Sequence, residues 1–228
     1  SRTVPFISKA TGIPMIDLAV GCMQGEKLIN SKFGTGIFKE RNITAVKAPV
    51  FSMSKLTDVD TFLGPEMKST GEVMGISKNY EEAISKAFLS SGINIPSNGS
   101  VLLSIANRDK DKAKYLIKLI HGKGYNLIAT PGTAKLIIDL GFSAQVIEKS
   151  LDKNPNVIDK LRSSEVIAVV NTVSGDSKTL HDGFKIRRES SERKIPCFTS
   201  LDTAEAVFKD EVKEDKLTVN SLDEYLRF

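Results

Sequence analysis

The sequence is poor in several features that define large classes of proteins. It has only two cysteines, Cys22 and Cys197, far apart and without the spacing of metal ligands. This scarcity excludes a disulfide framework and favours a reducing, cytoplasmic setting. No apolar run approaches the roughly 18 residues of a membrane-spanning helix, and no signal peptide is visible. The chain opens without an initiator methionine, so we expect it to be a fragment of something longer.

Charge of one sign is not concentrated anywhere along the chain. The 228 residues carry 32 Lys and Arg against 28 Asp and Glu, a formal net charge of +4 without a long basic block. Nucleic-acid-binding proteins usually need a concentrated basic face, so this distribution favours an anionic small molecule. We expect neither a nucleic-acid nor a membrane partner.

Familiar catalytic patterns are also missing: we find no Walker loop, GxGxxG, nucleophile elbow or metal-binding cluster. His121 and His181 belong to no catalytic motif, and His121 is expected to complement a helix dipole. Glu66 and Glu72 are better explained by loop structure than by an acid pair. Cys22 shares an apolar helix face, so we expect it in the core. No metal site and no cofactor are expected in this chain.

The pattern of the chain changes near its middle. Up to about residue 92 it is irregular, with a short helix over 11–23, a strand over 45–53 that Pro49 interrupts or places at an edge, and a helix that Asn79 caps with Glu82 in a capping box. Residues 90–100, "SSGINIPSNGS", are the best linker candidate.

Apolar strands and helices alternate regularly beyond this linker. Strands are predicted over 100–106, 125–130, 144–148, 165–171 and 194–198, and helices over 109–120, 132–141, 156–164 and 202–210. Such alternation predicts an α/β domain with a parallel sheet covered on both faces. Ligands of these sheets bind beyond the carboxyl ends of the strands.

The stretch "ATPGTAKL" at 129–136 lies at one such strand end and opens a helix. Gly132 lets backbone approach a ligand closely, and Thr130 and Thr133 add hydroxyl groups at a helix N-terminus that favours anions. The alternative is that Thr130 merely caps the helix. Other strand ends carry further polar groups, which favour a phosphorylated ligand when taken together, although each lysine alone is better explained as a surface charge: Ser104, Lys110, Lys149, Asn171 and Thr172.

Two N-terminal stretches, "SRTVPFISKATGIP" and "VDTFLGPEMKSTGEVMG", strongly resemble the large subunit of carbamoyl phosphate synthetase. The resemblance implies that residues 1–92 are the α+β tail of its second ATP-grasp unit. It implies that residues 93–228 are its methylglyoxal-synthase-like allosteric domain, a Rossmann-like three-layer fold.

This resemblance implies a function for the complete enzyme. That ATP-dependent ligase makes carbamoyl phosphate from bicarbonate, glutamine-derived ammonia and ATP, for arginine and pyrimidine synthesis. It uses Mg or Mn and a glutaminase small subunit, and it can form homo-oligomers through the terminal domain. Arg2 matches an arginine at the carbamate-phosphorylating site. We expect this fragment to be inactive alone, because the residues that bind the metal lie upstream.

The resemblance also implies an allosteric site for UMP or IMP. The family pattern falls on Ser104, Lys110, Thr130, Thr133, Lys149 and Asn171. The chain departs from the pattern at Val173, where some members carry a threonine, and at Ala48, where ornithine-activated members carry a glutamate. Two alternatives stay open: a methylglyoxal-synthase-type lyase, whose Gly-Gly-Asp motif is missing here, and a non-catalytic oligomerisation module.

Overall fold

The computed structural model describes residues 3–52, 60–62, 65–149, 156–172, 177–209 and 216–227. Arg2 and Val173 lie outside these residues. The chain forms two compact units, unit 1 within 1–50, 71–92 and 210–228, and unit 2 within 51–70 and 93–209. The expected division into domains 1–92 and 93–228 stays a prediction, because it concerns which parts of the chain fold independently.

Unit 1 is built around a two-stranded antiparallel sheet of β1 (Thr44–Val50) and β2 (Gly71–Ser77), against which α3 (Tyr80–Ser90) packs. The remaining elements of this unit are α1 (Thr3–Thr11), α2 (Met15–Met23), the short 3-10 helix η1 (Leu28–Asn30) and α9 (Leu222–Tyr225). Pro49 lies opposite Glu72 in the sheet. Among the described residues each of these strands has one neighbour, so Pro49 lies in an edge strand there, as predicted.

Two local predictions for unit 1 need correction. Cys22 is exposed, and α2 has no buried residue, so the core position predicted for this cysteine is wrong. An apolar helix face becomes core only where another surface covers it, and none of the described residues does so. Asn79 caps α3 as predicted, by accepting a 3.0 Å hydrogen bond from the Glu82 N–H. The carboxylate of Glu82, however, bonds Ser77 and Thr218 instead of closing the capping box.

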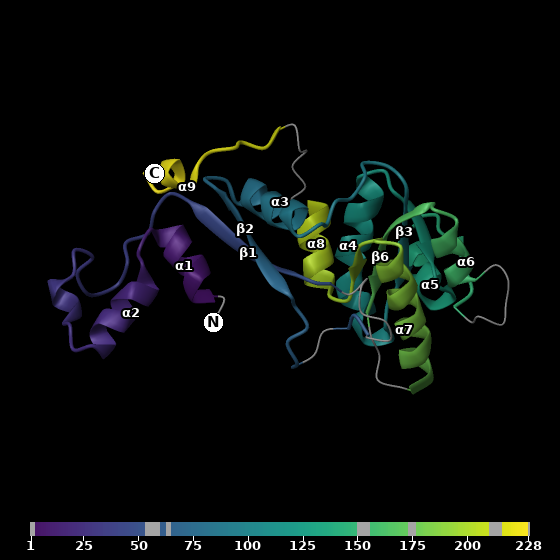
Figure 1. Ribbon diagram of the computed structural model, residues 1–228. Coiled ribbons are helices and arrows are strands. Elements are labelled where there is room, and N and C mark those ends of the chain that lie inside the picture. Colours follow the sequence, from purple (N-terminus) through teal and green to yellow (C-terminus); the bar gives the residue numbers. More distant parts are fainter. Residues whose placement is uncertain are drawn as a thin grey trace. The chain divides into compact units, whose positions relative to one another are not determined.

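Unit 2 contains a five-stranded parallel sheet in the order β5-β4-β3-β6-β7. Figure 1 labels its strands β3 and β6 among the helices of this unit. Its strands are β3 (Ser100–Ser104), β4 (Asn126–Ala129), β5 (Gln145–Val146), β6 (Val166–Asn171) and β7 (Cys197–Phe198). Its helices are η3 (Asn107–Asp109), a 3-10 turn, and α4 (Lys110–Gly122), α5 (Pro131–Asp139), α6 (Val157–Arg162), α7 (Ser177–Glu192) and α8 (Leu201–Lys209). The predicted α/β class and parallel sheet are confirmed.

The helices form two layers on the sheet. Helix α4 contacts both α5 and α8, and α6 contacts α7. A buried cluster joins Leu102, Ile128 and Val169 of the sheet to Leu161 of α6 and Ile186 of α7. Because successive strand residues point to opposite faces, the sheet buries apolar side chains under both layers. The result is the three-layer α/β arrangement that the alternating pattern predicted.

The hydrophobic pattern did not predict α7. Its buried positions are Gly183, Ile186, Arg187 and Ser190, at the three- and four-residue spacing of a helix face. Only Ile186 among them is a large apolar residue. Periodicity is read from apolar side chains, so a helix whose inner face is a glycine, an arginine and a serine leaves little signal.

The sheet has a topological switch point between β3 and β6. From β3 the chain moves outward to β4 and β5, and then returns to β6 on the other side of β3. The connections on the two sides therefore diverge at the carboxyl ends of β3 and β6, where open α/β sheets bind their ligands.

No single described helix is both long and apolar enough to cross a membrane. The pair α1 and α2 passes by length and composition only when the two are joined, and it bends by 113°.

Candidate functional site at the switch point

The structure brings the predicted polar residues of three strands together at the switch point. Ser104 ends β3 and pairs in register with Asn171, which ends β6. The N–H of Thr172 donates to the Ser104 carbonyl oxygen over 3.2 Å, and the N–H of Thr130 donates to the Leu103 carbonyl oxygen over 3.2 Å. All four polar residues are at least nine-tenths buried. The ends of β3, β4 and β6 thus form one small polar surface.

Two threonine hydroxyls of this surface hold the loop that follows β3. The Oγ1 atom of Thr133 accepts a 2.9 Å hydrogen bond from the Ile105 N–H, and the Oγ1 atom of Thr172 accepts a 2.8 Å bond from the Ala106 N–H. Both bonds are buried, so they join the loop firmly to the first turn of α5 and to the end of β6. Thr133 and Thr172 therefore shape this site.

Helix α5 begins at the same edge of the sheet. Thr130 is its N-cap residue by position, but its side chain makes no capping hydrogen bond and lies 3.5 Å from the Thr133 hydroxyl oxygen. The simple capping role considered for Thr130 therefore does not account for its side chain. A Cβ atom placed on Gly132 would lie 3.2 Å from the Nζ atom of Lys110. The ammonium group of Lys110 thus lies near Gly132 in the first turn of α5, at the helix end that favours an anion.

Three polar groups of this edge have no protein partner among the described residues. They are the Ser104 hydroxyl, the Nδ2 amide group of Asn171 and the Lys110 ammonium group. Ser104 and Asn171 are only 5% and 2% exposed. The described side-chain atoms that are fully buried without a partner are the hydroxyl oxygens of Ser31 and Thr61, so the free donors of Ser104 and Asn171 keep contact with solvent. Accessible donors at the switch point of a parallel sheet are placed where a ligand can bind them.

Sequence reasoning missed two charged residues of this edge, Arg187 and Asp60. Arg187 is 1% exposed, and its Nη1 atom donates to Oδ1 of Asn171 over 2.9 Å. Its Nε and Nη2 atoms donate to the two carboxylate oxygens of Asp60, at 2.8 and 2.5 Å. Burial raises the pKa of Asp60, but the hydrogen bonds and charge of Arg187 outweigh it and hold that pKa below its ordinary value. Nothing local in the sequence marks a pair 127 residues apart.

Three other predicted or considered residues lie elsewhere. Lys149 is half-buried beyond the end of β5, and β4 separates that strand from β3. Ala48 is buried in unit 1, where it pairs with Val73 of β2. His121, in the last turn of α4, stacks on the ring of Phe142 with centroids 4.2 Å apart. Stacking explains this histidine without a catalytic role.

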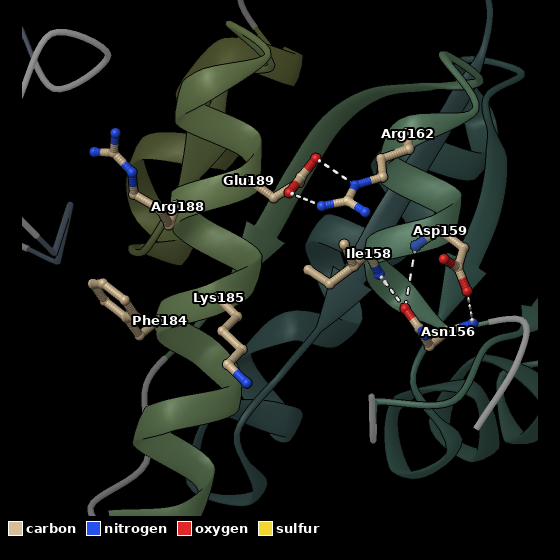
Figure 2. Close-up of a pocket in the computed structure, with 8 residues that line it drawn as sticks. All are labelled: Asn156, Ile158, Asp159, Arg162, Phe184, Lys185, Arg188 and Glu189. Carbon is tan, nitrogen blue, oxygen red and sulfur yellow. Dashed lines mark hydrogen bonds and ion pairs between the residues drawn. The ribbon is translucent and has the colours of Figure 1, made fainter. Parts of the chain in front are cut away.

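A pocket of about 360 Å³ opens between α6 and α7 (Figure 2). Across it, Nε and Nη2 of Arg162 donate a bidentate pair of hydrogen bonds to the Glu189 carboxylate, at 3.0 and 3.1 Å. Asn156 caps α6 below this pair, and Lys185 points down along α7. Arg162 and Glu189 neutralise each other, and none of the lining residues is one of the polar residues predicted at the strand ends. This pocket is therefore separate from the predicted site.

The described residues offer no other chemistry of note. They contain no group of three or more His, Cys, Asp or Glu side chains that could hold a metal ion. Burial raises the pKa of the Cys197 thiol to about 12, so this cysteine is not a nucleophile at neutral pH. Binding of an anion at the switch point is what the arrangement can do best.

Two comparisons with known proteins found similarities to this chain. A methylglyoxal synthase from Elizabethkingia anophelis NUHP1 is similar in structure, with 18% sequence identity and a TM-score of 0.39, over 59% of this chain and 93% of that one. Residues 112–199 match the family model of the MGS-like domain, so unit 2 contains an MGS-like domain.

Proposed function

We propose that the chain is the C-terminal part of a carbamoyl phosphate synthetase large chain, and that its MGS-like domain binds a regulatory nucleotide such as UMP or IMP. The two N-terminal motifs "SRTVPFISKATGIP" and "VDTFLGPEMKSTGEVMG" support the ligase assignment. The complete ligase would use ATP with Mg or Mn, and would work with a glutaminase small subunit in the cytoplasm. The fragment itself supplies regulation, and Arg2 would serve the complete enzyme only.

The unpartnered group of Ser104, Lys110 and Asn171 carries the regulatory part of this proposal. A nucleotide phosphate would lie over the first turn of α5, with the Lys110 ammonium as its counter-charge, because charge-assisted bonds to phosphate are the strong ones. The Ser104 hydroxyl and Asn171 amide would bind further oxygen atoms of the same ligand. Lys149 lies beyond the end of β5, one strand further from β3, so its predicted role as a second positive charge does not carry this proposal.

A methylglyoxal-synthase-type lyase acting on dihydroxyacetone phosphate is the second candidate, because the MGS-like match fits it equally well. The same phosphate position would serve that substrate. The sequence lacks the Gly-Gly-Asp motif. Among the described residues, Asp60 brings a carboxylate to this edge. It is ion-paired with Arg187 and its pKa is lowered, so it is a weak general base.

Isothermal titration with UMP, IMP and inorganic phosphate tests the proposal. Lys110→Ala should weaken nucleotide binding roughly ten- to a hundredfold, the loss of one charge-assisted bond of about 1.5–3 kcal/mol. It should also reduce the salt dependence of binding, because a screened charge is removed. Lys112→Ala, two residues along on the exposed side of α4, is the matched control and should bind like the wild type.

The other outcomes identify the alternatives. Turnover of dihydroxyacetone phosphate by the purified chain would favour the lyase. If no nucleotide binds and nothing is turned over, while the chain associates in sedimentation experiments, the oligomerisation module is the better description. In either case the regulatory proposal is refuted.

A further inference from the structure

We propose that Arg187 is a positioning residue of the switch-point site, which holds the oxygen atom of the Asn171 amide so that only N–H donors face the ligand. This inference rests on the proposed function, because it states which ligand chemistry that site selects. It adds Arg187, which the sequence analysis did not single out, to the predicted site residue Asn171.

The orientation of the Asn171 amide follows from its partner. An arginine side chain has only donors, so the atom of Asn171 that lies 2.9 Å from Nη1 of Arg187 must be the oxygen. The other end of the amide is then the NH₂ group, which has two N–H donors and no acceptor among the described residues. The site therefore selects a ligand that offers an oxygen acceptor at this point, either a base carbonyl or a phosphate oxygen.

Three features hold Arg187 in place. The carboxylate of Asp60 binds the Nε and Nη2 atoms together, which fixes the plane of the guanidinium group. The ring of Phe62 lies 5.9 Å from its Cζ atom. Gly183, one helical turn earlier in α7, provides the necessary space. A Cβ atom on Gly183 would lie 2.8 Å from Nη1 of Arg187 and 3.4 Å from Oδ1 of Asn171.

This geometry makes the proposal testable without changing a polar group. Gly183→Ala should displace the guanidinium group from Asn171, because the added carbon is closer to Nη1 than van der Waals contact allows. The glycine has no positive φ, so alanine is otherwise favourable in a helix. Gly122→Ala in α4 is the matched control, since a Cβ there meets nothing within 4 Å.

Two further variants separate positioning from support of the fold. Asn171→Asp keeps the oxygen that Arg187 binds but replaces both donors with a second acceptor. Arg187→Lys keeps the charge but loses the planar group that contacts Asp60 and Asn171 simultaneously. We expect all three variants to weaken UMP binding roughly tenfold or more. Asn171→Asp should keep the melting temperature of the wild type while it loses binding. A purely structural role for Asn171 predicts that binding and stability fall together.

A comparison of UMP with CMP identifies the acceptor. If Asn171 binds the C4 carbonyl of the base, the wild type prefers UMP and Asn171→Asp reverses the preference, because CMP has an amino group at C4. If Asn171 binds the phosphate or the C2 carbonyl, which both nucleotides carry, the two bind alike and Asn171→Asp weakens both. Wild-type affinity of Asn171→Asp for UMP overturns the proposal.

A ligand-free readout distinguishes failure of this inference from failure of the proposed function. If the wild type binds neither nucleotide, the proposed function fails, but the amide orientation can still be tested by NMR. The side-chain NH₂ resonances of Asn171 should shift in Gly183→Ala and stay in place in Gly122→Ala. Unchanged resonances in Gly183→Ala would show that Arg187 does not position the amide.

Discussion

Thr133, in the first turn of α5, accepts a 2.9 Å hydrogen bond from the backbone N–H of Ile105 in the loop after β3. Thr133 has no exposed surface, and Ile105 is 7% exposed, so water cannot easily replace this bond. The bond connects the loop after β3 to the first turn of α5, which follows β4. It also makes Thr133 a structural residue of the site, whatever ligand the site binds.

We expect Thr133→Val to destabilise unit 2 by about 1–3 kcal/mol, because the isosteric change leaves the Ile105 N–H buried without an acceptor. Urea unfolding followed by circular dichroism measures the loss. Thr133→Ser is the control, since it keeps the hydroxyl and should cost less. Equal stability of the two variants would mean that the hydroxyl contributes nothing.

Gly75 of β2 lies where α3 approaches the strand most closely. A Cβ atom there would be 2.0 Å from the Ala83 carbonyl oxygen and 2.5 Å from the Ala87 backbone nitrogen. Because both atoms belong to the backbone, the helix itself would have to move. We expect Gly75→Ala to cost at least the roughly 1–3 kcal/mol of overpacking, measured by thermal unfolding.

Gly71→Ala on the same strand is the matched control for Gly75→Ala. A Cβ at Gly71 would meet only the Val50 Cβ, at an ordinary 3.7 Å. We expect this variant to keep wild-type stability. A similar loss in both variants would point to a general intolerance of β2 for alanine instead of contact with α3.

Glu82 should make unit 1 sensitive to acid. Burial raises the pKa of this carboxyl, but hydrogen bonds from Ser77, Thr218 and Lys86 outweigh it and lower the pKa from 4.5 to about 2. A lowered pKa stabilises the folded state fully above pH 4.5, and the contribution is lost as the pH falls toward 2. Glu82→Gln should therefore flatten the dependence of stability on pH in this range.

Glu81→Gln is the control for the acid experiment, because Glu81 is the exposed neighbour on the same helix turn. Its unfolding curve should keep the pH dependence of the wild type between pH 4.5 and 2. If Glu81→Gln flattens the curve as much as Glu82→Gln, the acid sensitivity comes from overall charge and not from the Glu82 bonds.

Tyr225 should hold the C-terminal helix α9 against α3 within unit 1. Its hydroxyl accepts a 2.8 Å hydrogen bond from Nζ of Lys86 and donates over 3.3 Å to the Thr218 carbonyl oxygen. Tyr225→Phe should cost about 0.5–1.5 kcal/mol and speed amide hydrogen exchange in the described residues 216–227. Tyr80→Phe, on a residue that is 53% exposed, should leave exchange unchanged.

The strands and most helices of unit 2 could be predicted because their information is local. Ala113, Leu116, Ile117 and Ile120 all have no exposed surface in α4, as their spacing predicted. Ser104 and Asn171 could be selected as site residues because strand ends converge at one edge of any parallel sheet. Their roles as nucleotide ligands stay predictions.

Helix α7 and the position of Cys22 show the limits of local pattern. The inner face of α7 contains Gly183 and Arg187, whose burial depends on Asp60 and Asn171 being present opposite them. Cys22 has the right spacing for a core position, yet no described residue covers it. In both cases burial depends on residues outside the helix, which the pattern within the helix does not contain.

Side-chain periodicity within short segments was therefore enough to establish an α/β unit with a parallel sheet and a polar edge, since each strand and helix carries its own pattern of burial. Only the tertiary structure decided that a buried arginine joins Asp60 to Asn171 and orients the amide at that edge. The physical reason is that a charge can be buried only beside a partner that neutralises it, and here the partner lies 127 residues away in the sequence.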